Sequence, residues 1–130
     1  MKKVNLLLFG LFVTLASFAQ QPVITFETKT HDFGVVKEEA EKATYVFSFT
    51  NTGKAPLVIN RVQASCGCTT PTWTKEPIEP GKKGTVTVVY STANRPGAFT
   101  KSITVYSNAA EEQVVLMIKG EVTPKTVAAN

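Results

Sequence analysis

The chain has little cysteine, little histidine and little excess charge. Its 130 residues include two cysteines and one histidine, and its formal net charge is +4. Two cysteines exclude the dense disulfide framework of a small secreted scaffold. Two cysteines and one histidine also fall short of the four ligands that a structural zinc site takes from such side chains. The weak positive charge gives no reason to expect nucleic acid or an anionic membrane as a partner.

Long apolar runs are missing as well, and the longest one lies at the start of the chain. It extends from Val4 to Phe18, carries no charge and follows Lys2 and Lys3. Its fifteen residues are fewer than the roughly twenty that a membrane-spanning helix needs. Ser17 and Ala19 place small residues at the two positions that a signal peptidase reads. We therefore predict a signal peptide over residues 1–19 and no membrane insertion after its cleavage; the alternative is an uncleaved anchor.

Cleavage would leave a single domain outside the cytoplasm, in an oxidising compartment. It would remove Lys2 and Lys3, which lowers the net charge from +4 to +2. A domain of the remaining length buries roughly two thirds of its unfolded surface. The fold should therefore not need a disulfide for its stability.

Alternation of apolar and polar residues with a period of two dominates the rest of the chain. Tyr45, Phe47 and Phe49 fall on one face of such a segment, and Val115 and Met117 are expected to be partly covered in another. Turns rich in Gly, Pro and Asn separate the segments. The predicted strands are residues 23–28, 33–37, 44–50, 57–62, 85–90, 99–105 and 114–118.

About seven short strands joined by such turns predict an all-β fold, a two-sheet β-sandwich of immunoglobulin-like type. We expect this domain to cover residues 20–123 and a flexible tail to cover residues 124–130. An antibody-type domain has two widely spaced cysteines with a tryptophan between them. Here the cysteines are two residues apart and Trp73 follows them, so the architecture fits but the antibody signature does not.

The two cysteines, Cys66 and Cys68, flank Gly67 and are the main candidate site. Gly67 allows the bend that a local disulfide requires, although closing a three-residue loop should contribute only about 1.6 kcal/mol. Three alternatives stay open. The pair could be a redox-active dithiol, a two-thiolate copper(I) site or a reduced structural pair. No other metal or cofactor is expected.

The segment after the cysteines is rich in Pro and Thr and is expected to be a loop. Trp73 should anchor this loop to the core or form part of a contact surface. Ser65, Gly67, Thr69 and Trp73 are therefore the candidate binding loop.

Two other sets of polar residues are expected to have structural roles and not catalytic ones. His31 and Asp32 are expected to be a surface histidine and a turn contact rather than an acid–base pair. The acidic residues 38–41 are expected to form a solvated hairpin tip. No triad spacing of Ser, His and Asp is present.

Six short motifs resemble, in order, a known protein family. They are residues 31–34 (HDFG), 49–53 (FTNTG), 55–59 (APLVI), 64–69 (ASCGCT), 78–81 (IEPG) and 103–108 (ITVYSN). This series is similar to the domain-of-unknown-function 1573 family, from about residue 24 to residue 122. The resemblance implies an immunoglobulin-like fold, related to major sperm protein and pilus-chaperone domains, and a secreted or surface location in bacteria. It implies no activity, because the family has no settled biochemical role.

Together these features favour a non-catalytic binding or structural module, secreted or periplasmic, in the bacterial cell envelope. Its expected partner is an unknown envelope protein or surface component. The alternative function is a copper carrier or thiol-redox protein that uses Cys66 and Cys68. No recognisable catalytic constellation supports an enzyme.

Overall fold

The computed structural model describes residue 10 and residues 20–125. Apart from Gly10, the predicted signal peptide lies outside the described residues, and so does most of the predicted tail. The described part is built from strands, with one short 3₁₀ turn at Glu38–Ala40. Within it, no helix is long and apolar enough to cross a bilayer.

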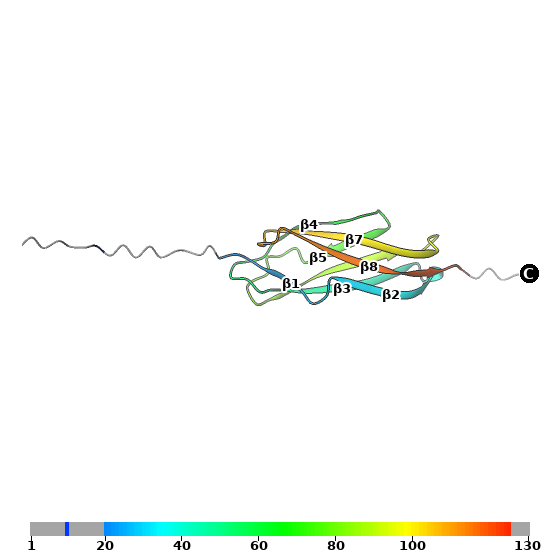
Figure 1. The fold of residues 1–130 in the computed structure, drawn as a ribbon, viewed down its shortest axis with the longest axis horizontal. Helices are drawn as coiled ribbons and strands as arrows, with labels where there is room; N and C mark the ends of the chain where they lie inside the picture. The colour runs from blue at the N-terminus through cyan, green and yellow to red at the C-terminus, as the bar shows by residue number, and fades with distance from the viewer. Residues whose placement is uncertain (1–9, 11–19, 126–130) are drawn as a thin grey trace, which may run out of the picture.

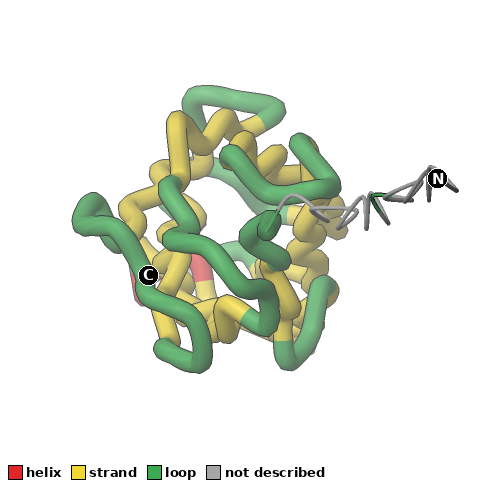
Figure 2. The backbone as a smooth tube through the Cα atoms, turned by 90° about the vertical axis from the view of Figure 1, so that its left-hand side faces the viewer, coloured by secondary structure: helices red, strands yellow, loops and turns green. Residues whose placement is uncertain are grey.

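The described residues form two sheets of four strands each (Figure 1). Sheet A has the order β1-β3-β6-β5, and sheet B has the order β2-β8-β7-β4. Figure 2 views the domain along its strands, from the end near the N-terminus. The strands are β1 (Ile24–Phe26), β2 (Thr30–Lys37), β3 (Lys42–Asn51), β4 (Ile59–Ala64), β5 (Thr69–Trp73), β6 (Lys83–Ser91), β7 (Gly97–Ser107) and β8 (Gln113–Thr123).

The predicted two-sheet sandwich is confirmed, but it has eight strands and not seven. The strand that the sequence did not predict is β5, which had been expected to be a loop. It pairs with β6 from Thr69↔Tyr90 to Trp73↔Val86, at the edge of sheet A. Pro71 lies in this strand and weakens a strand pattern, but proline is tolerated on an edge because one side of the strand needs no hydrogen-bonded partner.

The inward faces predicted from the alternation make up the core. Phe47 and Phe49 are fully buried between the sheets, whereas Tyr45 is only partly buried. Val115 and Met117 are partly covered, as expected, although at 53% and 37% exposure they count among the exposed large apolar residues. They lie on the outer face of sheet B, against which no described element packs.

The chain passes from sheet A to sheet B between β1 and β2, and the HDFG motif (residues 31–34) lies near the start of β2. β1 pairs antiparallel with β3, whereas β2 pairs parallel with β8 and bulges between Asp32 and Val35. Gly34 has a φ of +66° at this bulge and donates its N–H to Asp32 Oδ1 at 2.8 Å. The His31 ring stacks on Tyr45 of sheet A with centroids 3.6 Å apart. His31 and Asp32 therefore lie in a strand: Asp32 makes the expected local turn contact, and the half-buried His31 joins the two sheets through Tyr45.

The acidic residues 38–41 do not form a hairpin tip, because they connect β2 of sheet B to β3 of sheet A. Glu41 has a φ of +65°. The buried Thr92 fastens this turn: its N–H donates to Glu41 O at 2.9 Å and its hydroxyl donates to Glu38 O at 3.2 Å. Two turns that are far apart in the sequence are thus bonded to each other.

The end of the sandwich nearest the N-terminus, here called the asparagine end, is fastened by two asparagine side chains. Asn51 is fully buried. Its Nδ2 donates to Ala55 O and Ile78 O, both at 2.8 Å, and its Oδ1 accepts the N–H of Val23 at 3.3 Å and of Gly53 at 3.0 Å. One side chain thus satisfies backbone groups from three separate segments.

Asn108 makes a second, more exposed clamp at the same end. Its Oδ1 accepts the Val58 N–H at 2.8 Å, and its Nδ2 donates to Pro56 O at 3.1 Å. Three of the family-like motifs therefore meet at the asparagine end, because Asn51 of FTNTG and Asn108 of ITVYSN both bond to the backbone of APLVI.

Candidate functional site: the Cys66–Cys68 crossover

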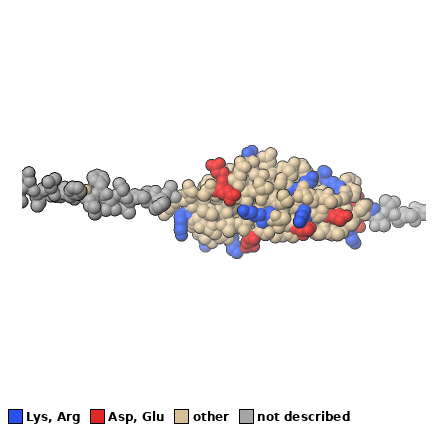
Figure 3. Space-filling view, viewed as in Figure 1, with Lys and Arg blue, Asp and Glu red and all other residues tan. Residues whose placement is uncertain are grey.

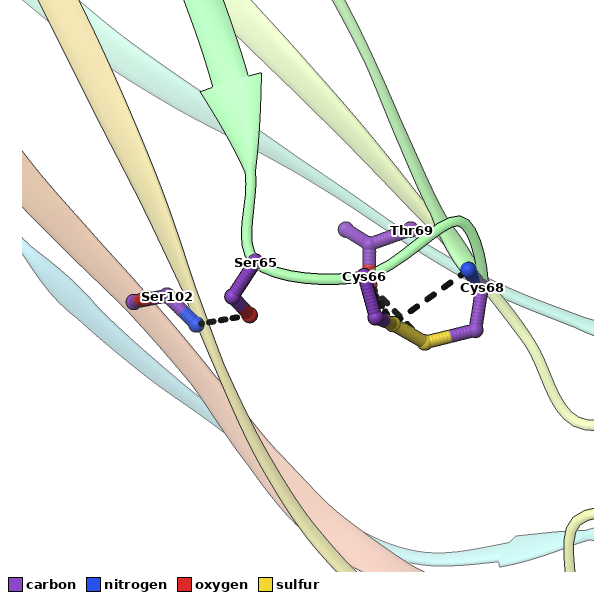
Figure 4. The surroundings of a disulfide bond; sticks show 5 residues. All are labelled: Ser65, Cys66, Cys68, Thr69 and Ser102. Carbon is purple, nitrogen blue, oxygen red and sulfur yellow. Dashed lines mark hydrogen bonds between the residues drawn. A yellow bond between two sulfur atoms is a disulfide. The ribbon is translucent and has the colours of Figure 1, made fainter.

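Four residues, 65–68, carry the chain from one sheet to the other. β4 ends at Ala64 in sheet B, and β5 begins at Thr69 in sheet A. Both are edge strands, so the crossover runs along the side of the sandwich (Figure 4). We call residues 65–68 the crossover.

Cys66 and Cys68 are joined by a disulfide, and their Cα atoms are 5.3 Å apart. The two cysteines differ in exposure. Cys68 is 6% exposed and belongs to the core, whereas Cys66 is half-buried and packs against the core. Gly67 is exposed, and a Cβ added to it would meet no other atom within 4 Å. The crossover therefore presents Gly67 and part of Cys66 to solvent.

Two donors converge on the Cys66 sulfur. The Cys68 N–H donates to Cys66 Sγ at 3.3 Å, and the hydroxyl of Thr69 lies 3.8 Å from the same sulfur (Figure 4). The Thr69 hydroxyl is also 3.7 Å from Cys68 Sγ. Because a disulfide sulfur carries no hydrogen, Thr69 is the donor in either contact. Thr69 is itself buried, so its hydroxyl is held in this position.

Backbone hydrogen bonds hold the crossover independently of the disulfide. Thr69 N–H donates to Cys66 O at 3.3 Å, and Ser91 N–H donates to Cys68 O at 2.9 Å. At the other end, Ser65 and Ser102 are doubly joined: Ser65 N–H donates to Ser102 O at 2.9 Å, and Ser102 N–H donates to Ser65 Oγ at 3.2 Å (Figure 4). The path of the chain is therefore fixed at both ends without the sulfur–sulfur bond.

Three of the candidate binding residues lie in or beside the crossover, and the fourth does not. Ser65, Gly67 and Thr69 are within it or adjacent to it, whereas Trp73 lies at the far end of β5. Trp73 is half-buried against the core, and Lys75 Nζ lies 3.1 Å from the centroid of its ring. Trp73 therefore ends a strand instead of lying in a loop, and its ring contacts both the core and Lys75.

A hollow of about 280 Å³ lies beside the crossover, and sequence reasoning did not find it. Its lining includes Cys68 and Gly67, together with Lys42 of β3 and Ser91 of β6. These strands are brought together only by the pairing of β3 with β6, in which Lys42 lies opposite Ser91. No local pattern in the sequence signals this neighbourhood.

Figure 3 shows acidic and basic side chains interspersed over the face that it presents. Within residues 20–125, no three His, Cys, Asp or Glu side chains gather as a metal site would need. A copper site at the crossover would therefore depend on Cys66 and Cys68 alone.

Comparisons with known proteins agree with the fold. The profile of a family described as "Protein of unknown function (DUF1573)" matches residues 24–122. No curated protein matches the chain. A protein of unknown function from Porphyromonas gingivalis W83 is similar at a TM-score of 0.69 and 18% identity, over 79% of this chain and 48% of the other. This chain thus spans about half the length of that protein.

Two further structures share the sandwich at low identity. The PapD-like domain 7 of human CEP192 has a TM-score of 0.65 and 8% identity, over 82% of this chain and 89% of that domain. The VesB protease of Vibrio cholerae has a TM-score of 0.59 and 14% identity, over 79% of this chain and 32% of the protease. At these identities the likeness concerns the fold alone.

Proposed function

The chain belongs to the DUF1573 family of proteins of unknown function, and from this premise we propose that it is a non-catalytic binding or structural module of the cell envelope. The module would be exported by the signal peptide over residues 1–19 and would hold an envelope protein or a surface component. A PapD-like sandwich fits this role, since its rigid sheets can position loops and edges for recognition.

The observation that carries the proposal is that the polar groups of the crossover are bonded within the chain itself. Ser65 bonds to Ser102, and the Thr69 hydroxyl bonds to the sulfurs. No described histidine or carboxylate pairs with these hydroxyls, as activation of a nucleophile would require. The Ser65 and Thr69 hydroxyls therefore have structural partners and no group that would activate them as nucleophiles.

Fractionation and mass measurement test this proposal together. We expect the chain, carrying a tag at its C-terminus, to be recovered from the envelope fraction. Its mass should be that of a polypeptide whose first residue is Gln20. Cross-linking in intact cells should then join it to an envelope component. An Ala19→Lys variant is the matched control, because a long charged residue at the cleavage position should leave the uncleaved chain in the membrane fraction. A full-length chain recovered from the cytoplasm would contradict the proposal.

The alternative of a copper carrier is tested on the same purified protein. Two thiolates can hold copper(I) only after the disulfide is reduced. The test is to reduce the protein, add copper(I) and measure the bound metal by native mass spectrometry. One copper per chain that is lost in Cys66→Ser would favour the carrier, whereas no uptake would favour the binding module.

A further inference from the structure

We propose that the Cys66–Cys68 pair is a reversible dithiol–disulfide couple that exchanges with the cysteines of an envelope polypeptide, with Cys66 as the reacting sulfur and Cys68 as the resolving one. This activity is additional to the binding role proposed above.

The first argument is the asymmetry between the two sulfurs. Thiol–disulfide exchange needs one accessible sulfur whose thiolate is stabilised, and a second cysteine that closes the bond again. Cys66 is the more exposed of the two, and the Cys68 N–H points at its sulfur. The Thr69 hydroxyl lies 3.8 Å from Cys66 Sγ and 3.7 Å from Cys68 Sγ, so it can donate to either sulfur. Hydrogen bonds to a charged group favour the charged form. After reduction, these donors would stabilise a thiolate at Cys66, while Cys68 stays in the core beside it.

The second argument is that the crossover should survive the opening of the bond. Closing a three-residue loop contributes only about 1.6 kcal/mol, and backbone bonds from Ser65, Thr69 and Ser91 hold the crossover at both ends. The two cysteines therefore stay close when reduced, so the bond can form again without refolding of the domain.

The third argument is the space beside the pair. The hollow of about 280 Å³ is lined by Cys68 and Gly67 and lies on the side of the crossover that faces β3 and β6. Lys42, Thr70 and Ser91 give it polar groups that can bond to the backbone of an extended chain. Cys66 itself does not line the hollow, but its chain neighbour Gly67 does, so a polypeptide lying there would pass beside the exposed part of Cys66.

The exchange balances as a two-electron reaction. The reduced Cys66 thiolate attacks a disulfide of the partner, so that a bond forms between Cys66 Sγ and one partner sulfur and the other partner sulfur leaves as a thiolate. The Cys68 thiolate then attacks Cys66 Sγ, which closes the Cys66–Cys68 bond and releases the second partner thiolate. The partner disulfide is reduced to a dithiol and the Cys66–Cys68 dithiol is oxidised; the reverse sequence oxidises a partner dithiol.

The test uses the purified full chain, first reduced, and glutathione disulfide as the partner. We expect Cys68→Ser to accumulate a mixed disulfide of Cys66 with glutathione, and Cys66→Ser to react at least tenfold more slowly at neutral pH. Equal rates for the two variants, or no mixed disulfide in Cys68→Ser, would overturn the proposal. Because glutathione replaces the cellular partner, the result is independent of where the protein resides.

Two further measurements keep the proposal testable if a variant does not fold. In the reduced wild-type chain, limited alkylation followed by peptide mapping should label Cys66 before Cys68, and preferential labelling of Cys68 would contradict the assignment.

Thr69→Val should slow the reaction of Cys66 severalfold by removing a donor. Thr72→Val, which changes an exposed threonine of the same strand outside both the sulfur contacts and the hollow, should leave the rate unchanged. Equal rates in these two variants would exclude a role for the Thr69 hydroxyl.

Discussion

Asn51 and the Cys66–Cys68 disulfide both fasten a loop to the sandwich, but they differ in the length of chain that they hold. The Asn51 side chain makes four hydrogen bonds, to residues up to 28 positions away. The disulfide joins two residues that are two positions apart. The non-covalent clamp therefore organises the fold, whereas the covalent one fixes a single turn. Bond strength is thus a poor guide to structural importance here.

The largest loss of stability is expected for Asn51→Ala. The change would remove four hydrogen bonds to buried or partly buried backbone groups, among which Ile78 O keeps a second bond, from the Leu57 N–H. An unsatisfied buried group costs about 1–3 kcal/mol before the structure relaxes. We expect the free energy of unfolding to fall by about 4 kcal/mol, at the upper end for a single substitution. Urea denaturation followed by the fluorescence of Trp73, the only tryptophan, measures it. Asn60→Ala, at an exposed asparagine, is the control and should change the stability by less than about 0.5 kcal/mol. A similar loss in both variants would refute the clamp.

The second-largest loss of stability is expected at Asn108, the other asparagine of the asparagine end. Asn108→Ala removes the bonds to Val58 N–H and Pro56 O, but this side chain is exposed and water can replace part of them. We expect a loss of about 2 kcal/mol. Asn108→Asp keeps the acceptor for Val58 and loses the donor to Pro56, so it should fall between alanine and wild type. A loss for Asn108→Ala that exceeds that for Asn51→Ala would reverse the ranking within the asparagine end.

A smaller effect is expected when the disulfide is removed. The Cys66→Ser/Cys68→Ser variant should lose no more than about 1.6 kcal/mol, since the loop that it opens has three residues. The same denaturation experiment, repeated on the wild-type chain with and without reductant, gives an independent value. A loss as large as that of Asn51→Ala would show that the disulfide is a principal support of the fold, and the comparison made above would fail.

The smallest change in stability is expected in the turn at residues 38–41, which is bonded to Thr92. Glu41 has a φ of +65°, a conformation that costs a residue with a Cβ more than it costs glycine. Glu41→Gly should therefore raise the free energy of unfolding by about 0.5 kcal/mol, after the greater freedom of glycine in the unfolded chain is subtracted. Asn94→Gly, at a φ of +59°, is the comparison and should gain less, because asparagine tolerates this region better. Destabilisation by Glu41→Gly would contradict this account.

The sequence predicted what depends on local alternation and missed what depends on register. Phe47 and Phe49 follow a period of two and form part of the core, as expected. β5 was missed, because Pro71 and the surrounding threonines resemble a loop until β6 supplies a pairing partner. The burial of Cys68 and the neighbourhood of Lys42 were missed for the same reason: they arise where β3, β5 and β6 meet. The residues of the candidate site could be named from sequence, but their exposure and contacts could not.

The parallel pairing of β2 with β8 has a mechanical consequence. The described chain begins and ends at opposite ends of the long axis, beside β1 and β8 (Figure 1). A pull applied between Gln20 and Lys125 would draw β2 and β8 past each other along their length. The hydrogen bonds between them would then be loaded together, in shear, instead of opening one after another. A tether anchored at both ends would meet its greatest resistance to stretching at this pair of strands.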